Sequence, residues 1–206
     1  QTTSNASDAV TVTARAGAIS DAGDTDTDIV TGASGQATLN AVTGIGSGNA
    51  IETSLGTLDV TNTASGNIQI REVASGGDLD ILNALQSGAG TLIIRTLDGI
   101  LTVLAGPAGA GVSAQSGAVT LDAQDAGGSG NGDLVLNNTV TSTSGKINLD
   151  AANDVIADAN GDVTSTSGEI EVSAGDNLEM ADGTEFTTGG IIDVDAGNNV
   201  LLGSLN

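Results

Sequence analysis

The chain has 206 residues, of which 26 are Asp or Glu and 4 are Lys or Arg, so its formal net charge is −22. It contains one Phe and one Met, and no Trp, Tyr, His or Cys. This composition excludes disulfides, Cys/His zinc sites, haem ligation and a Ser-His-Asp triad. Nucleic-acid binding is not expected either, because the chain can neither neutralise a run of phosphates nor stack aromatic rings on bases.

One short phrase recurs along the chain, in which Gly is followed by alternating variable and apolar residues. Clear copies are Gly117-Ala118-Val119-Thr120-Leu121 and Gly168-Glu169-Ile170-Glu171-Val172. Because alternation of apolar and variable residues is typical of half-buried strands, we expect every copy of this phrase to be the first strand of a coil. Residues 1–16 precede the copies and are expected to form an extended or assembly strand. The copies begin at Gly17, Gly35, Gly56, Gly77, Gly99, Gly117, Gly145, Gly168 and Gly190, with a mean spacing of about 22 residues.

Each period holds two further segments, a second strand such as 66–70 and a polar segment such as 162–167. Short strands between glycine corners cannot bury their apolar faces alone, whereas stacked coils bury them in a continuous column. The sequence therefore predicts an all-β fold, a right-handed parallel β-helix (a β-solenoid) of about 22 residues per coil and roughly eight to nine coils. This domain is expected to span 17–206, with an inserted corner loop near 124–132. Residues 79–86, the most helix-like stretch, are expected to be a strand in the same register.

Three phrases carry a resemblance to a known family: Ser-Gly-Glu-Ile-Glu-Val-Ser-Ala at 167–174, Ala-Gly-Asp-Asn-Leu at 174–178 and Ala-Gly-Asn-Asn-Val at 196–200. Over about 35–206 the chain resembles the parallel β-helix repeats of filamentous-haemagglutinin-type adhesins and autotransporter passengers of bacterial surfaces. The resemblance implies a long, thin, secreted rod that holds binding regions away from the cell.

The densest acidic cluster is Asp21, Asp24, Asp26 and Asp28. Alternating Asp and Thr place several carboxylates on one side of an extended loop, where hard oxygen ligands could converge on Ca²⁺. The glycine and the distal Glu of an EF-hand loop are missing. A solvated acidic corner is therefore the alternative interpretation, and Ca²⁺ at these four residues is a hypothesis.

Arg71 and Arg95 occupy equivalent places, five residues after Gly66 and Gly90, so they are expected to stack on adjacent coils. Two guanidiniums about 4.8 Å apart need carboxylates such as Glu72, or a bound anion, between them. Structural ion pairing is the simplest interpretation. The alternative is a β-helical protein that binds or degrades acidic polysaccharides, although the motifs of β-helical galacturonases are missing.

Threonine rows offer a third function class. Thr141-Ser142-Thr143 and Thr164-Ser165-Thr166 lie 23 residues apart, and Thr187 continues the row. Ice- or mineral-binding solenoids display such rows. Ordinary Thr ladders with their strand propensity explain so short a row equally well.

The favoured interpretation is a non-enzymatic, extracellular structural or adhesive module that forms a rod, stalk or filament. Its expected partners are itself (as a homopolymer or as neighbouring repeats) and a cell-surface or glycan ligand. No catalytic residue is predicted, because nothing distinguishes a pair among the 26 acids and no His is present to move protons. No cofactor is required, with Ca²⁺ as the one candidate. Membrane insertion is not expected, because no run approaches the roughly 20 apolar residues of a membrane span.

Overall fold

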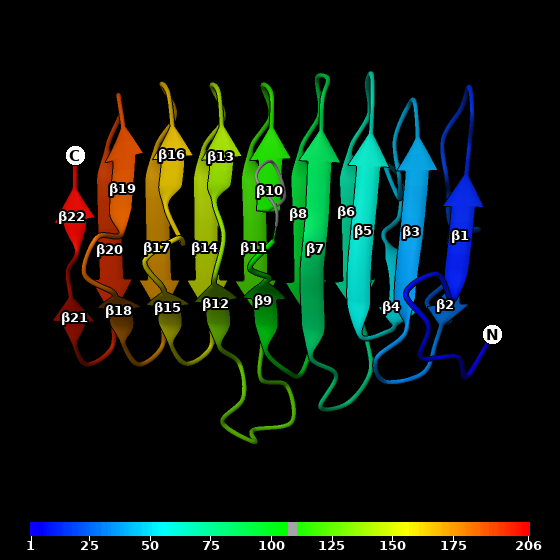
Figure 1. The fold of residues 1–206 in the computed structure, drawn as a ribbon, viewed down its shortest axis with the longest axis horizontal. Helices are drawn as coiled ribbons and strands as arrows, with labels where there is room; N and C mark the ends of the chain where they lie inside the picture. The colour runs from blue at the N-terminus through cyan, green and yellow to red at the C-terminus, as the bar shows by residue number, and fades with distance from the viewer. Residues whose placement is uncertain (107–110) are drawn as a thin grey trace.

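A computed structural model describes residues 1–106 and 111–206 and shows one continuous β-solenoid (Figure 1). The described residues form 22 strands and no helix, and every strand pairing is parallel. The front strands in Figure 1 run upward and the rear strands downward while the chain advances from right to left, so the coil is right-handed. The predicted fold class is thereby confirmed.

The rear wall is an eight-stranded sheet with one strand from each coil. Register partners in this sheet lie between 19 residues apart (Ile51 and Ile70) and 28 apart (Val119 and Ile147). In order, its strands are β2 (Ile29–Val30), β4 (Ile51–Ser54), β6 (Ile68–Glu72), β8 (Leu92–Thr96), β11 (Val119–Ala123), β14 (Ile147–Ala151), β17 (Ile170–Ala174) and β20 (Ile192–Ala196).

The front wall is a fourteen-stranded sheet that divides along its length. Its undivided part is β1 (Val10–Thr13), β3 (Gln36–Ala41), β5 (Thr57–Asn62) and β7 (Leu79–Gln86). One branch then runs through β9 (Leu101–Val103), β12 (Leu134–Leu136), β15 (Val155–Ala157), β18 (Leu178–Met180) and β21 (Val200–Leu201). The other runs through β10 (Gly111–Ala114), β13 (Val140–Ser142), β16 (Val163–Ser165), β19 (Glu185–Thr188) and β22 (Ser204–Leu205).

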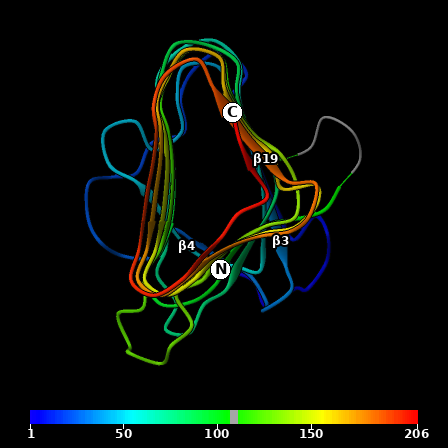
Figure 2. The ribbon, with the colours of Figure 1, turned by 90° about the vertical axis from the view of Figure 1, so that its left-hand side faces the viewer.

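β7 is the strand at which the front sheet divides. Residues 79–81 pair with β9 and residues 83–86 pair with β10, so one eight-residue strand is continued by two short ones. Coils before β7 therefore have one front strand and one rear strand. Later coils have two short front strands and one rear strand, and their cross-section is three-sided (Figure 2). Residues 79–86 form a strand, as predicted.

The core is a column of aliphatic side chains between the walls. Inward positions repeat on each coil, as in the register row Ile68, Leu92, Val119, Ile147 and Ile170, and each of these side chains is fully buried. Most outward positions on the same strands carry polar residues, with Ile93 as an apolar exception, so the alternation shows which side chains face inward. The single Phe, Phe186, is also buried. A narrow core of this kind has little need for large aromatic side chains.

The recurring glycines lie where successive coils approach each other most closely. A Cβ placed on Gly145 would lie 2.1 Å from the carbonyl oxygen of Gly117, and one placed on Gly117 would lie 1.7 Å from that of Gly90. The row continues through Gly168 and Gly190. Only a residue without a Cβ fits there, which explains why the phrase begins with Gly.

The assignment of all phrase copies to one strand per coil was wrong. The phrases at Gly35, Gly56, Gly77 and Gly99 lead into the front wall, through β3, β5, β7 and β9. Those at Gly117, Gly145, Gly168 and Gly190 lead into the rear wall, through β11, β14, β17 and β20. Strands of both walls follow a glycine corner and bury alternate residues, so the phrase does not distinguish the walls.

Two segments outside the regular coils complete the description. Residues 10–13 form β1 and pair with β3, so the first residues extend the front wall. Residues 124–133 form the corner loop that protrudes between β11 and β12 (Figure 1). Among the described residues, no helix has the length and apolar character to cross a membrane.

Candidate functional site

An acidic cluster lies on the outside of the rear wall, near the start of the chain. One carboxylate oxygen from each of Asp21, Asp28 and Glu52 lies within 4.8 Å of the others. Asp28 immediately precedes β2, and its carboxylate accepts a 3.0 Å hydrogen bond from the Glu52 backbone N–H on β4. Asp21 belongs to the loop 20–28, which stands outside this wall (Figure 2, left). The cluster therefore joins a loop to two neighbouring coils.

Two of the four predicted calcium ligands belong to this cluster. Asp21 and Asp28 are brought together, whereas Asp24 and Asp26 are exposed and outside the cluster of three. The Asp24 carboxylate accepts a hydrogen bond from the backbone N–H of Asp26, and the Asp24 carbonyl accepts one from Asn49. Glu52 was missed because it lies on the next coil, far from the Asp run in sequence.

Glu52 is the most deeply buried member of the cluster. Although its position on β4 faces outward, the residue is only 2 % exposed. Its Oε2 is inaccessible and has no hydrogen-bond donor among residues 1–106 and 111–206, and the same is true of Asp21 Oδ1. Burial raises the pKa of Glu52 above its ordinary value, and repulsion from Asp21 and Asp28 adds to this shift.

The other two carboxylates respond differently to their surroundings. The Asn49 amide, which donates to Asp21 Oδ2 at 2.5 Å, lowers the pKa of Asp21, with help from the Gly23 backbone N–H. Burial is the main cause that raises the pKa of Asp28, and the negative charge of Asp21 adds to it. The arrangement offers hard oxygen ligands, some of them without a protein partner, which is the donor set that suits a cation of group 2.

Arg71 and Arg95 are direct register partners on β6 and β8, which confirms the predicted stacking. Their carboxylate partners lie at the two ends of the pair. Glu52 Oε1 is 3.9 Å from Arg71 Nη1, and Asp122 Oδ2 accepts a 2.5 Å hydrogen bond from Arg95 Nε. The expectation that Glu72 separates the two guanidiniums was wrong, because Glu72 follows the inward alternation of β6.

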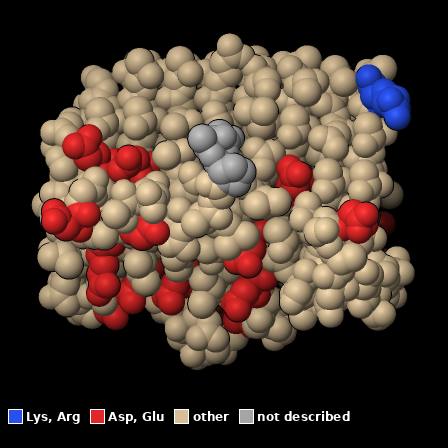
Figure 3. All heavy atoms as spheres, in the orientation of Figure 1, with Lys and Arg blue, Asp and Glu red and all other residues tan. Residues whose placement is uncertain are grey.

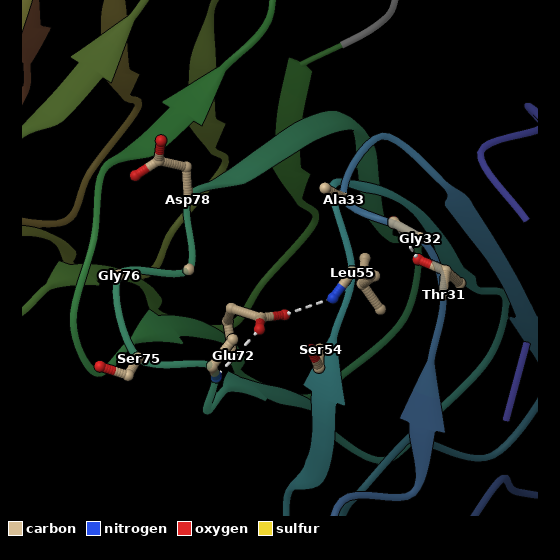
Figure 4. Close-up of a pocket in the computed structure, with 11 residues that line it drawn as sticks. Thr31, Gly32, Ala33, Ser54, Leu55, Glu72, Ser75, Gly76 and Asp78 are labelled. Carbon is tan, nitrogen blue, oxygen red and sulfur yellow. Dashed lines mark hydrogen bonds between the residues drawn. The ribbon is translucent and has the colours of Figure 1, made fainter. Parts of the chain in front are cut away.

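Glu72 instead lines a surface pocket of about 370 Å³ at a corner of the solenoid (Figure 4). Its carboxylate accepts hydrogen bonds from the Leu55 N–H (3.1 Å), the Thr53 hydroxyl (2.9 Å) and the Ala74 N–H (3.2 Å). Burial raises the pKa of Glu72 to about 7. A carboxyl with such a pKa could serve as a general base, but three donors already hold this one in place. The geometry is that of a buried cap for backbone groups.

The threonine row is present but short. Thr141, Thr164 and Thr187 are register partners on β13, β16 and β19 and are half-buried. The residues that follow the first two, Ser142 and Ser165, point inward and hydrogen-bond to the glycine corners. These segments therefore contribute to the packing of the coils.

Comparisons with known protein families, with curated proteins and with solved structures return no match for this chain. Its function is therefore inferred from its own geometry.

Proposed function

We propose that this protein is a non-enzymatic structural module, a rod that lengthens by stacking further coils on its terminal coil. The proposal depends on one observation, the state of the last coil. There the inward-facing side chains of Val200 and Leu205 are 46 % and 38 % exposed. Equivalent inward positions one coil earlier, such as Leu178 and Phe186, are fully buried.

The strands of this coil also have an open edge. Within the described part of the chain, β20, β21 and β22 each pair with one strand only, so their other edges offer free backbone N–H and C=O groups. At the opposite end, β1 likewise pairs only with β3, and its Val10 and Val12 are half-buried. Open edges and uncovered apolar side chains are the features through which strands add to a sheet.

The occupant that we propose is the first coil of a second copy. In a head-to-tail arrangement all strands keep the same direction, so the new pairs would be parallel like those within the chain. Such a contact joins two different surfaces, and it therefore repeats without closing and produces a filament.

We place this rod outside the cell, as the resemblance to surface adhesins implies, with its sides facing a cell-surface or glycan partner. The net charge of −22 supports that setting, because exterior salt screens the repulsion between acidic side chains. Figure 3 shows acidic groups spread over the middle and lower parts of one face, while the upper rim has almost none. The same repulsion should oppose association at low ionic strength.

Light scattering coupled to size-exclusion chromatography, followed by electron microscopy, tests the proposal. At high protein concentration and high salt we expect end-to-end multimers that dissociate on dilution into low salt. Val200→Lys should prevent them, because it places a charge at an inward position of the open end, whereas Ser129→Lys, which adds the same charge on the exposed corner loop, should not. A wild-type chain that stays monomeric in all these conditions would refute the proposal, as would equal association of the Val200→Lys variant.

A further inference from the structure

We propose that Asp21, Asp28 and Glu52 form a binding site for Ca²⁺ that fastens the loop 20–28 to β4. Asp21 and Asp28 lie on one loop and Glu52 lies on the next coil, and one carboxylate oxygen of each lies within 4.8 Å of the others. Ligands about 2.4 Å from a shared Ca²⁺ lie at most about 4.8 Å from one another, so the cluster already has dimensions suited to this ion.

The buried carboxylate of Glu52 supplies the independent observation. Its side chain is 3 % exposed, and Oε2 receives no hydrogen bond from any residue that the structure describes. A buried carboxylate oxygen without a donor is unfavourable, because neither water nor protein compensates its charge. Asp21 Oδ1 is in the same state. A cation held among the three carboxylates would satisfy both oxygens at once.

The cations of the protein itself do not fill this role. Arg71 is the basic residue in register with Glu52, and its Nη1 lies 3.9 Å from the other oxygen, Oε1. Arg71 also has Arg95 as its neighbour on the far side, so its own position is electrostatically crowded. Asp24 lies on the same loop and adds negative charge near Asp28. The cluster therefore keeps an excess of negative charge.

Calcium is the metal that these donors suit best. All three ligands are carboxylates, and the chain has no Cys or His, which zinc sites usually contain. Mg²⁺ holds its ligands at about 2.0–2.1 Å in a strict octahedron, so the three oxygens would have to move closer together. Asp28 is exposed, which leaves room for water to complete the larger and more flexible shell of Ca²⁺.

The bound ion would act as a fastener between coils. Loop 20–28 already contacts the loop 46–50 through Asn49, which donates hydrogen bonds to Asp21 and to the Asp24 carbonyl. Ca²⁺ would add a link from this loop to the strand of the next coil. The expected result is a first coil that resists unfolding in a calcium-containing medium and loosens when calcium is removed.

Isothermal titration calorimetry with CaCl₂, and separately with MgCl₂, tests the site on the full 206-residue chain. We expect one Ca²⁺ per chain, with a Kd of about 10⁻⁴–10⁻³ M, the range of extracellular calcium modules, and weaker binding of Mg²⁺. Glu52→Gln and Asp21→Asn should each weaken Ca²⁺ binding at least about tenfold. Asp26→Asn removes the same charge from the same loop without touching the cluster, so its affinity should match the wild type.

Melting followed by circular dichroism gives a second readout that does not depend on heat of binding. In chelator, Glu52→Gln should melt at or above the wild type, because it removes a buried carboxylate oxygen without a donor. With Ca²⁺ in excess the order should reverse, because only the wild type gains stability from the ion. Absence of calcium binding by the wild type overturns the proposal, and so does an equal loss of affinity in Asp26→Asn, which would indicate diffuse charge attraction.

Discussion

Ser165 and Gly145 connect two successive coils through one hydrogen bond. The Ser165 hydroxyl donates to the Gly145 carbonyl at 2.9 Å, and Ser165 Oγ accepts a hydrogen bond from the Gly168 N–H at 2.9 Å. Ser142 does the same with Gly117 and Gly145 one coil earlier. A hydroxyl near each glycine corner therefore satisfies backbone groups that the sheet ladder leaves unpaired there.

Replacing Ser165 by Ala should destabilise the fold by about 1–3 kcal/mol, because a carbonyl and an N–H would lose their partner inside the structure. Ser165→Thr should be tolerated, since Thr188 is the register partner of Ser165 and bonds to Gly168 in the same way. Chemical denaturation of both variants, with the exposed Ser167→Ala as control, measures the difference. Equal stability of Ser165→Ala and Ser167→Ala would contradict this role.

Gly145→Ala should also destabilise the protein, by about 1–3 kcal/mol, because the new methyl group would collide with the Gly117 carbonyl of the preceding coil. Gly48 is the matched control, since a Cβ on that residue would meet nothing within 4 Å and its backbone conformation is open to other residues. We expect Gly48→Ala to be neutral or slightly stabilising. Thermal melts of the two variants would show the contrast, and a similar loss in both would disprove the close approach.

Glu72 should make the stability depend on pH. Its pKa is raised from 4.5 to about 7 by burial, so between these values the folded state keeps a proton that the unfolded chain releases. Stability from this residue is therefore fully present below about pH 4.5 and is lost as the pH rises toward 7, by about 3 kcal/mol in total.

The variant Glu72→Gln isolates this contribution, because it cannot titrate and has nearly the same shape. Denaturation at several pH values between 4.5 and 7.5 should show that the wild type loses more stability than Glu72→Gln on going to high pH. Both proteins share the remaining acidic residues, so general charge repulsion cancels in the comparison. Parallel pH profiles would mean that Glu72 titrates normally.

Arg95→Met should cost about 2 kcal/mol, because it leaves the carboxylate of Asp122 buried without its cation. The cost is below that of a fully buried pair, since the Arg95 side chain is 42 % exposed. Burial, together with repulsion from the stacked Asp150, already raises the pKa of Asp122, and Arg95 opposes that shift. Adding Asp122→Asn to Arg95→Met should restore most of the loss, as a double-mutant cycle would reveal. No coupling between the two sites would rule out the pair as a stabilising contact.

The fold could be predicted from the sequence because one rule acts on every coil. Residues that alternate between apolar and polar define the inward face, and the same rule identifies Glu72, which follows Ile68 and Ile70 at the next inward position. The sequence does not show to which wall each Gly phrase belongs, because strands of both walls have the same alternation of apolar and polar residues. Only the pairing partners, such as Ile147 with Val119, decide it.

The acidic cluster could be predicted only in part, for a different reason. Asp21 and Asp28 lie in one loop, so their proximity follows from sequence distance. Glu52 occupies an outward position between the inward residues Ile51 and Thr53 and would be expected in solvent. Its burial depends on the path of two irregular loops, and neither periodicity nor turn chemistry specifies such a path. A row of acids in the sequence therefore indicated the region of the site but not its deepest ligand.

Because the front wall divides at β7, coils can be added or removed at some places in the solenoid but not at others. After β7, each coil repeats the same three short strands with matched registers, as in Ile147 to Ile170 and Val140 to Val163. A whole coil could be copied or removed there, and its neighbours would meet each other as before. β7 is different, because it alone joins the undivided strand β5 to the two branches. β7 therefore joins coils with two strands to coils with three. The number of coils on its C-terminal side can vary, whereas β7 itself occurs once.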